Sequence, residues 1–233
     1  MMRLVNQFLS RLKSLFGRGE HYATLAEYWQ ARARRYGRRS VLNLAHPDDE
    51  YDAVTLRQQQ ILFPLLKQEL RGHERKLLDF GCGPGRFTGG LAELIDGRAV
   101  GVDIVPELLR IAPASARVEY LVMEAGGALP FEDASFDIVW SCLVLGGIPE
   151  GQLQRALAEI DRVLRPGGLF FFAEGTAQQA GSAHWFFRDE ARYRDLARFC
   201  TPRVVGRYED VGEAITVFCG RKSGDDAVRL RIE

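Results

Sequence analysis

A glycine-rich segment at residues 77–88 holds the residues of this sequence best suited to bind a ligand. It reads Leu77-Leu78-Asp79-Phe80-Gly81-Cys82-Gly83-Pro84-Gly85-Arg86-Phe87-Thr88, an apolar run, a turn and the start of a helix. Glycines in such a turn let the backbone approach a ligand closely because they have no Cβ. The Gly-x-Gly-x-Gly spacing departs from the Gly-x-Gly-x-x-Gly of dinucleotide-binding proteins. Asp79 would repel a pyrophosphate, so it favours a positively charged amino or sulfonium group.

Acidic residues also follow the next two apolar runs. Asp103 ends the run 99–103 and precedes Ile104, and a carboxylate there can accept hydrogen bonds from both hydroxyls of a ribose. Glu124 and Ala125 follow the run 118–123, where an acidic side chain and a backbone amide could bind an adenine. These positions predict a nucleoside-binding site at the ends of successive strands.

Short apolar runs alternate with amphipathic stretches from residue 76 onward, which is typical of βαβ units and a parallel sheet. We expect strands at 76–80, 99–103, 118–123, 136–142 and 169–173, with a late strand at 214–220. Helices are expected at 86–95, 106–111 and 152–164. Further upstream, 40–52 is expected to be a loop and 55–70 a helix that Pro64 kinks or restarts. The fold class is therefore a doubly wound α/β domain.

Five segments in register resemble the class I S-adenosylmethionine (SAM)-dependent methyltransferases, especially the group that includes the ubiquinone and menaquinone methyltransferases. They are the loop at 79–85, Asp103, Leu129-Pro130-Phe131, Ser135-Phe136-Asp137, and the turn Arg165-Pro166-Gly167-Gly168. The resemblance is strong over residues 76–174 and looser over 204–222, where the family places an antiparallel hairpin. Met123-Glu124-Ala125 departs from the Gly-Asp-Ala that is frequent in the family.

The resemblance implies a Rossmann-like seven-stranded sheet, mostly parallel with an antiparallel C-terminal strand, and a helical N-terminal cap. It implies SAM as the cofactor and S-adenosylhomocysteine as the product. The residues expected to bind the cofactor are Asp79, Gly81, Cys82, Gly83, Gly85, Asp103, Ile104, Glu124, Ala125 and Ser141.

Methyl transfer requires alignment of nucleophile, methyl carbon and sulfur, and a general base where the nucleophile carries a proton. The sequence does not identify this base. Three candidates are His46 in a loop, Glu174 at the end of the fifth strand, and His184 beside Trp185. Each has a structural alternative, because His46-Pro47 can form a turn, Glu174 can cap a loop and His184 can lie on the surface.

Aromatic residues are frequent on both sides of the expected core, in residues 20–60 and 176–200. They suit a cover over a small organic acceptor, such as a sugar, quinone, lipid head group or secondary metabolite, methylated at oxygen or nitrogen. They could equally pack a cap against the sheet. We expect no metal site, because the four cysteines and four histidines have no ligand-like spacing. The aromatic residues are Tyr22, Tyr28, Trp29, Tyr36, Trp185, Phe186, Phe187 and Tyr193.

The composition sets limits on partners and location. Thirty-one basic residues balance 31 acidic ones, which argues against a dedicated nucleic-acid binder. Residues 1–16 form an amphipathic helix pattern that could pack on protein or lie on an anionic membrane surface. The expected location is the cytoplasm, with peripheral contact to the inner membrane face as an option. The oligomeric state is left open.

The chain is expected to comprise an N-terminal helix (1–19), a helical cap (20–72), a SAM-binding core (73–222) and a polar tail (223–233). Two other functions stay open. One is methylation of protein or RNA, favoured by the arginine cluster at 32–39, although such runs are usually solvated. The other is a SAM-binding partner subunit without catalysis.

Overall fold

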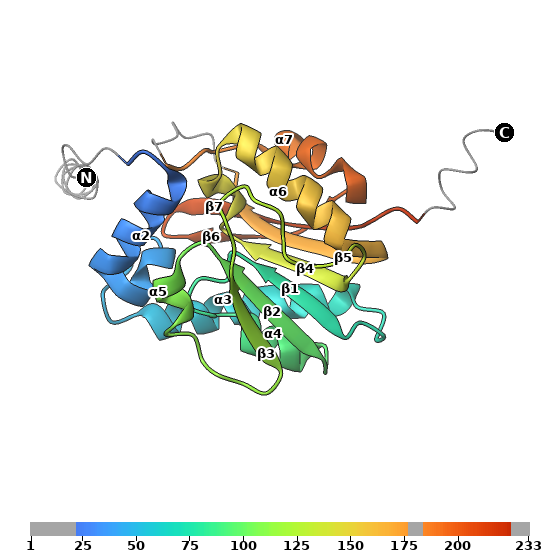
Figure 1. Ribbon diagram of the computed structural model, residues 1–233, viewed down its shortest axis with the longest axis horizontal. Coiled ribbons are helices and arrows are strands. Elements are labelled where there is room, and N and C mark those ends of the chain that lie inside the picture. Colours follow the sequence, from blue (N-terminus) through green and yellow to red (C-terminus); the bar gives the residue numbers. More distant parts are fainter. Residues whose placement is uncertain (1–21, 177–183, 225–233) are drawn as a thin grey trace.

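A seven-stranded sheet in the order β3-β2-β1-β4-β5-β7-β6 forms the centre of the molecule (Figure 1). The computed structural model describes residues 22–176 and 184–224. The strands are β1 (Lys76–Phe80), β2 (Arg98–Asp103), β3 (Val118–Val122), β4 (Phe136–Cys142), β5 (Leu164–Gly175), β6 (Arg203–Asp210) and β7 (Glu213–Arg221). β7 runs antiparallel to β5 and β6, and β1 to β5 are parallel. The expected mostly parallel sheet with an antiparallel C-terminal strand is confirmed.

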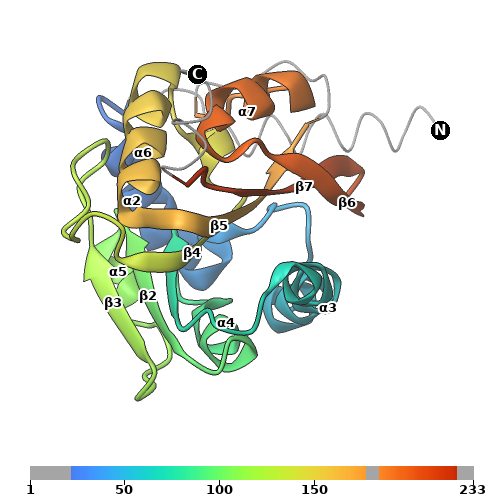
Figure 2. The same ribbon diagram turned by 90° about the vertical axis from the view of Figure 1, so that its right-hand side faces the viewer.

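Helices cover both faces of the sheet (Figure 2). α6 and α7 lie on one face, while α3 and α4 lie on the other. α2 packs with α5 beyond the sheet edge at which the parallel strands end. The helices are α2 (Leu25–Tyr36), α3 (Tyr51–Glu69), α4 (Thr88–Leu94), α5 (Pro106–Leu109), α6 (Glu150–Val163) and α7 (Glu190–Leu196), with short 3₁₀ turns η1 (Gly37–Val41), η2 (Leu145–Gly147) and η3 (Arg198–Cys200).

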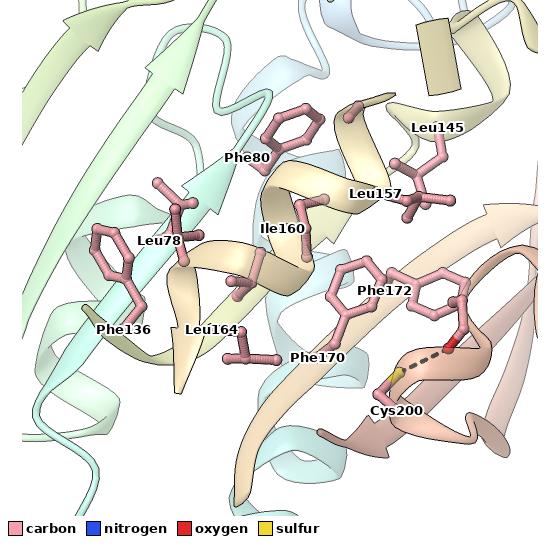
Figure 3. Packing of buried hydrophobic residues seen from close by; sticks show 14 of the residues in the cluster. Leu78, Phe80, Phe136, Leu145, Leu157, Ile160, Leu164, Phe170, Phe172 and Cys200 are labelled. Carbon is pink, nitrogen blue, oxygen red and sulfur yellow. Dashed lines mark hydrogen bonds between the residues drawn. The ribbon is translucent and has the colours of Figure 1, made fainter. Parts of the chain in front are cut away.

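Side chains of β5 alternate between the two faces of the sheet and so contribute to the hydrophobic core on each face. Phe170 and Phe172 face α6 and α7 and are fully buried (Figure 3), while Phe171 faces α3 and α4 and stacks on Trp140. Successive side chains of a strand point to opposite faces, so a strand covered on both sides is a continuous apolar run. That burial is the reason why the strands could be located in the sequence.

The helix at 51–69 begins earlier than expected. The expected loop at 40–52 overlaps η1 and the first two residues of α3, and α3 continues through Pro64 as a single helix. Leu62 and Leu66 are fully buried on either side of Pro64, and this packing offsets the hydrogen bond that proline cannot donate. α3 therefore forms part of the layer that covers the sheet.

Other differences lie near the C-terminus. α7 was not expected from the sequence, and β5 extends at both ends beyond 169–173. β6 occupies the region that was expected to hold a hairpin only through the family resemblance. The expected helix at 1–16 and most of the tail at 223–233 fall outside the described residues, and the division of the chain at residue 72 stays a prediction.

Candidate functional site

A cavity of about 480 Å³ opens at the edge of the sheet where the parallel strands end. Such a volume is in the range of small-molecule sites, about 300–1,000 Å³. Its walls come from the loop after β1, the ends of β2 and β3, the segments 40–44 and 142–148, α2, and the β6–β7 hairpin. The site is thus assembled from segments that lie far apart in the sequence.

The glycine loop after β1 forms a tight backbone curve at one end of the cavity. The amides of Gly81 and Cys82 both donate to the carbonyl of Val102, at 2.9 and 3.0 Å. Gly81 has φ +75°, and a Cβ there would lie 2.5 Å from the Val144 side chain. Only glycine fits this position without strain, because the backbone is left-handed and the space is occupied.

The expected glycines divide into two groups. Gly81 and Cys82 line the cavity. Gly83 and Gly85 lie behind its wall: a Cβ on Gly83 would meet Val41, and one on Gly85 would meet the Tyr120 ring. In the geometry described, the last two glycines allow close packing around the loop rather than direct access to the cavity.

Asp79 is a buried carboxylate at the base of this loop. It is 2% exposed, lines the cavity, and accepts a hydrogen bond from the Thr88 hydroxyl at 2.6 Å. Burial, together with the nearby negative charge of Asp103, raises the pKa of Asp79 to about 7 against the opposing effects of the Thr88 hydrogen bond and the Arg86 charge. No side chain among residues 22–176 and 184–224 forms an ion pair with Asp79. A cationic ligand would supply the missing charge and favour the ionised carboxylate.

Asp103 lies at the end of β2 and is held rigidly. Its two oxygens accept from the amides of Gly83, at 2.8 Å, and Val105, at 2.9 Å. Burial raises the pKa of this carboxyl to about 6 despite those bonds. Asp103 and Ile104 line the cavity, as do Glu124 and Ala125 after β3. The structure therefore brings together the four positions expected at the strand ends.

Ser141 lies elsewhere. Its side chain is fully buried within β4, its hydroxyl has no hydrogen-bond partner among the described residues, and it does not line the cavity. The wall at this strand is formed by the next three residues, Cys142, Leu143 and Val144. Leu143 has φ +58°, which turns the chain sharply as it leaves the strand. The alternation within β4 explains the placement, because Ser141 faces the α6 side.

The three candidate bases do not line the cavity. His46 is buried and its Nε2 lies 2.9 Å from Oδ1 of Asp210. His184 stacks on Tyr28 with ring centroids 3.9 Å apart, and burial lowers its pKa. Glu174 is fully buried and accepts from three consecutive amides, those of residues 144, 145 and 146, at 2.8–3.0 Å. Burial raises the pKa of Glu174 to about 7.

Glu174 and Arg188 together fix the turn η2. The guanidinium of Arg188 donates to the carbonyls of Leu145 and Ile148, at 3.2 and 2.9 Å. The turn supports two aromatic residues, because Gly146 lies against Trp185 and Gly147 against Trp29. In this structure, Glu174 therefore shapes the cavity wall through the backbone that it binds.

The aromatic residues separate into lining and packing groups. Tyr28, Trp29, Trp185 and Phe187 line the cavity. Tyr22 packs edge-on to Tyr28, and Tyr36 lies near the Arg32 guanidinium. Phe186 lies near the Arg188 guanidinium. Tyr193 is 1% exposed and packs in the core against Phe172 and Phe218.

Three carboxylates in the cavity wall were missed from the sequence, namely Glu159 in α6 and the pair Asp210 and Glu213. Asp210 and Glu213 lie at the tip of the β6–β7 hairpin, more than 100 residues beyond the glycine loop. No local motif marks them. Topology could have indicated the last two, because a hairpin that joins a parallel sheet places its turn at one of the two ends of the strands.

Residues 22–176 and 184–224 contain no group of three or more His, Cys, Asp or Glu side chains able to hold a metal ion. Within the same ranges, no helix has the length and hydropathy needed to cross a bilayer. All four cysteines are free thiols.

Comparisons with known proteins agree with this geometry. Residues 78–172 match the methyltransferase domain family. A malonyl-[acyl-carrier protein] O-methyltransferase of Serratia marcescens is 33% identical over 174 residues, covering 72% of this chain and 67% of that protein. A probable methyltransferase of Aspergillus luteorubrus is 37% identical over 106 residues, 40% of this chain and 37% of its own length. The chain thus spans well under two thirds of some of its relatives.

A solved structure shares the fold. It is the 1,6-didemethyltoxoflavin-N1-methyltransferase of Burkholderia thailandensis with its acceptor and S-adenosylhomocysteine bound, with a TM-score of 0.62 and 24% identity over 88% of this chain and 93% of that one. The chain belongs to the class I SAM-dependent methyltransferases. SAM is therefore the cofactor of this chain. Asp79, a buried carboxylate without an ion pair among the described residues, lies beside the glycine loop and fits the positively charged methionine portion of SAM.

Proposed function

We propose that this chain transfers the methyl group of SAM to an oxygen or nitrogen atom of a small organic acceptor. The observation that carries the proposal is the single cavity that joins the buried carboxylates Asp79 and Asp103 to an aromatic compartment. One end has the features expected of a SAM site, and the other has room and apolar surface for a second molecule. Methyl transfer requires both molecules in one enclosed space.

Residues of the glycine-loop end would hold the cofactor. Asp79 would face the positively charged methionine portion, and Asp103 the ribose hydroxyls. Glu124 and Ala125 would bind the adenine edge. SAM supplies an activated methyl group when it is bound, so this chain has to orient the acceptor and exclude water.

The aromatic side of the cavity favours a small acceptor, which is either a free molecule or a small group attached to a carrier protein. Trp29 and Trp185 lie on the glycines of η2, with Tyr28 and Phe187 in the same wall. Flat aromatic walls bind planar or apolar groups by stacking and burial. Similar proteins carry names of both kinds, since one is a 1,6-didemethyltoxoflavin-N1-methyltransferase and another a malonyl-[acyl-carrier protein] O-methyltransferase.

The test incubates methyl-labelled SAM with the protein and fractionated host extract. Label is expected in a small-molecule or carrier-bound fraction. The Asp79→Asn variant is the comparison and should incorporate less label at low SAM concentration, because it keeps an acceptor for the Thr88 hydroxyl and removes the charge. Label in bulk protein or RNA would contradict the small acceptor. SAM binding measured by calorimetry without transfer to any fraction would instead favour a non-catalytic partner subunit.

A further inference from the structure

The tip of the β6–β7 hairpin carries two carboxylates that face each other. Asp210 ends β6, Glu213 begins β7, and the two are cross-strand partners. Val211 and Gly212, with φ of +51° and +81°, reverse the chain between them. β6 ends at the same edge of the sheet as β1, because both run antiparallel to the direction of β7. The pair is therefore part of the cavity that also holds Asp79.

The loop at 42–50 holds one oxygen of each carboxylate. Oδ1 of Asp210 pairs with His46 at 2.9 Å, and Oε1 of Glu213 accepts from the Asn43 amide at 3.4 Å. Asp210 is more than nine-tenths buried, and Glu213 is half-buried. Their second oxygens accept no hydrogen bond from residues 22–176 or 184–224. Each acid thus keeps one free acceptor atom in the cavity wall.

The surroundings of Glu213 increase its affinity for a proton. Burial and the negative charge of Asp210 raise the pKa of Glu213, and the Asn43 hydrogen bond opposes this rise. His46, from the loop, lies against Asp210. Arg86, from the segment before α4, also lines the cavity and donates to Gln58. A carboxylate with a raised pKa takes up a proton more readily than an ordinary glutamate does, as a general base must.

We propose that Glu213 is the general base of the transfer, with Asp210 as the positioning residue beside it. This inference rests on the proposed function. A nitrogen or hydroxyl lone pair of the acceptor forms a bond to the methyl carbon, and the carbon–sulfur bond breaks with its electron pair passing to sulfur. The proton of the acceptor passes to Glu213. The acceptor class that this step requires is an amine or a hydroxyl compound, rather than a carboxylate already free of its proton.

The test compares Glu213→Gln with Glu209→Gln, its exposed neighbour on β6, using methyl-labelled SAM and the extract fraction that accepts label. Glutamine keeps an oxygen for Asn43 and cannot take a proton. The Glu213→Gln variant is expected to lose about 10²–10⁴-fold in kcat, as for removal of a general base, with unchanged SAM affinity. Glu209→Gln should keep the wild-type rate.

A second variant separates the base from a merely structural acid. Asp210→Asn keeps an oxygen for His46 and removes the charge that raises the proton affinity of Glu213. The acidic limb of the kcat profile is expected to move to lower pH, and the carboxyl resonance of Glu213, followed in protein with ¹³C-labelled glutamate, should titrate at the same lower value. The NMR titration is independent of turnover, so it also applies to a variant with low activity.

The outcomes separate the two proposals. Absence of transfer by the wild-type protein would overturn the proposed function and, with it, this inference. Transfer that Glu213→Gln leaves intact would overturn the inference alone. A rise in acceptor KM at unchanged kcat in Glu213→Gln would also overturn the inference, because it would indicate that Glu213 binds a cationic group of the acceptor. A labelled product that is a methyl ester of a carboxylate would overturn it as well. An unchanged pH profile in Asp210→Asn would likewise remove the proposed role of the pair.

Discussion

At the scale of single residues, the feature most important for cofactor binding is the buried carboxylate of Asp79, which forms no ion pair with any described residue. Water solvates an ionised carboxylate well, and Asp79 has exchanged that water for one hydroxyl and a protein interior. Replacing Asp79 with Asn should weaken SAM binding by at least about tenfold, since a buried charge–charge interaction commonly contributes more than 1.4 kcal/mol. Calorimetric titration of both proteins with SAM measures this difference in affinity. Unchanged affinity would show that the cationic portion binds elsewhere.

The raised pKa of Asp79 also predicts how cofactor affinity depends on pH. Its pKa is about 7 in the folded protein and about 4 in an unfolded chain. The folded form therefore holds this proton more tightly, and the contribution of Asp79 to stability is lost as pH rises from about 4 to 7. A bound cation favours the ionised form. SAM affinity should thus increase by up to about tenfold per pH unit as pH rises towards 7, and level off above it.

The control for this prediction is the Asp79→Asn protein over the same pH range. It should keep only the slope that Asp103 contributes below about pH 6, where the pKa of that second carboxyl lies. A wild-type affinity that does not change between pH 6 and 7 would contradict the assignment of the slope to Asp79.

At the scale of elements, the turn η2 depends on a buried side chain of the strand β5. Glu174, in β5, accepts from three amides of residues 144–146. Glu174→Gln replaces one acceptor oxygen with a donor that faces those amides, so the free energy of unfolding should fall by about 1–3 kcal/mol. Denaturant unfolding, with the exposed Glu132→Gln as control, measures this loss. An equal stability of the two variants would show that the turn holds without the carboxylate.

The sequence predicted elements where a local pattern coincides with burial. β1 and β4 have the bounds that their apolar runs indicated, and Asp79 and Asp103 lie where the loop and strand ends placed them. A local sequence pattern does not indicate which residues far apart in the sequence will contact each other. The contact of His46 with Asp210 joins residues 164 positions apart, so its meaning depends on the topology of the hairpin. For the same reason Glu174 could be named as a candidate, while its three amide partners could not.

At the scale of the whole molecule, stability depends on two apolar layers that share the sheet. Phe172 is fully buried and stacks on both Phe170 and Phe218. Phe172→Ala should lower the free energy of unfolding by about 3–5 kcal/mol, the usual cost of a cavity left by an aromatic side chain. Leu56→Ala, at a position 54% exposed, should change it by less than about 0.5 kcal/mol. Comparable losses in the two variants would contradict this view of the core.

The order of the last three strands has a consequence for how the protein is made. β7 inserts between β5 and β6 although it is synthesised after both. While the ribosome is still adding residues 203–212, β6 has no partner strand, and the cavity lacks the wall that Glu213 provides. Since chains are synthesised at about 5–20 residues per second, this interval is short but obligatory. The glycine loop and Asp103 emerge more than 100 residues earlier, so a nascent chain acquires the cofactor end of its site well before the end assigned to the acceptor.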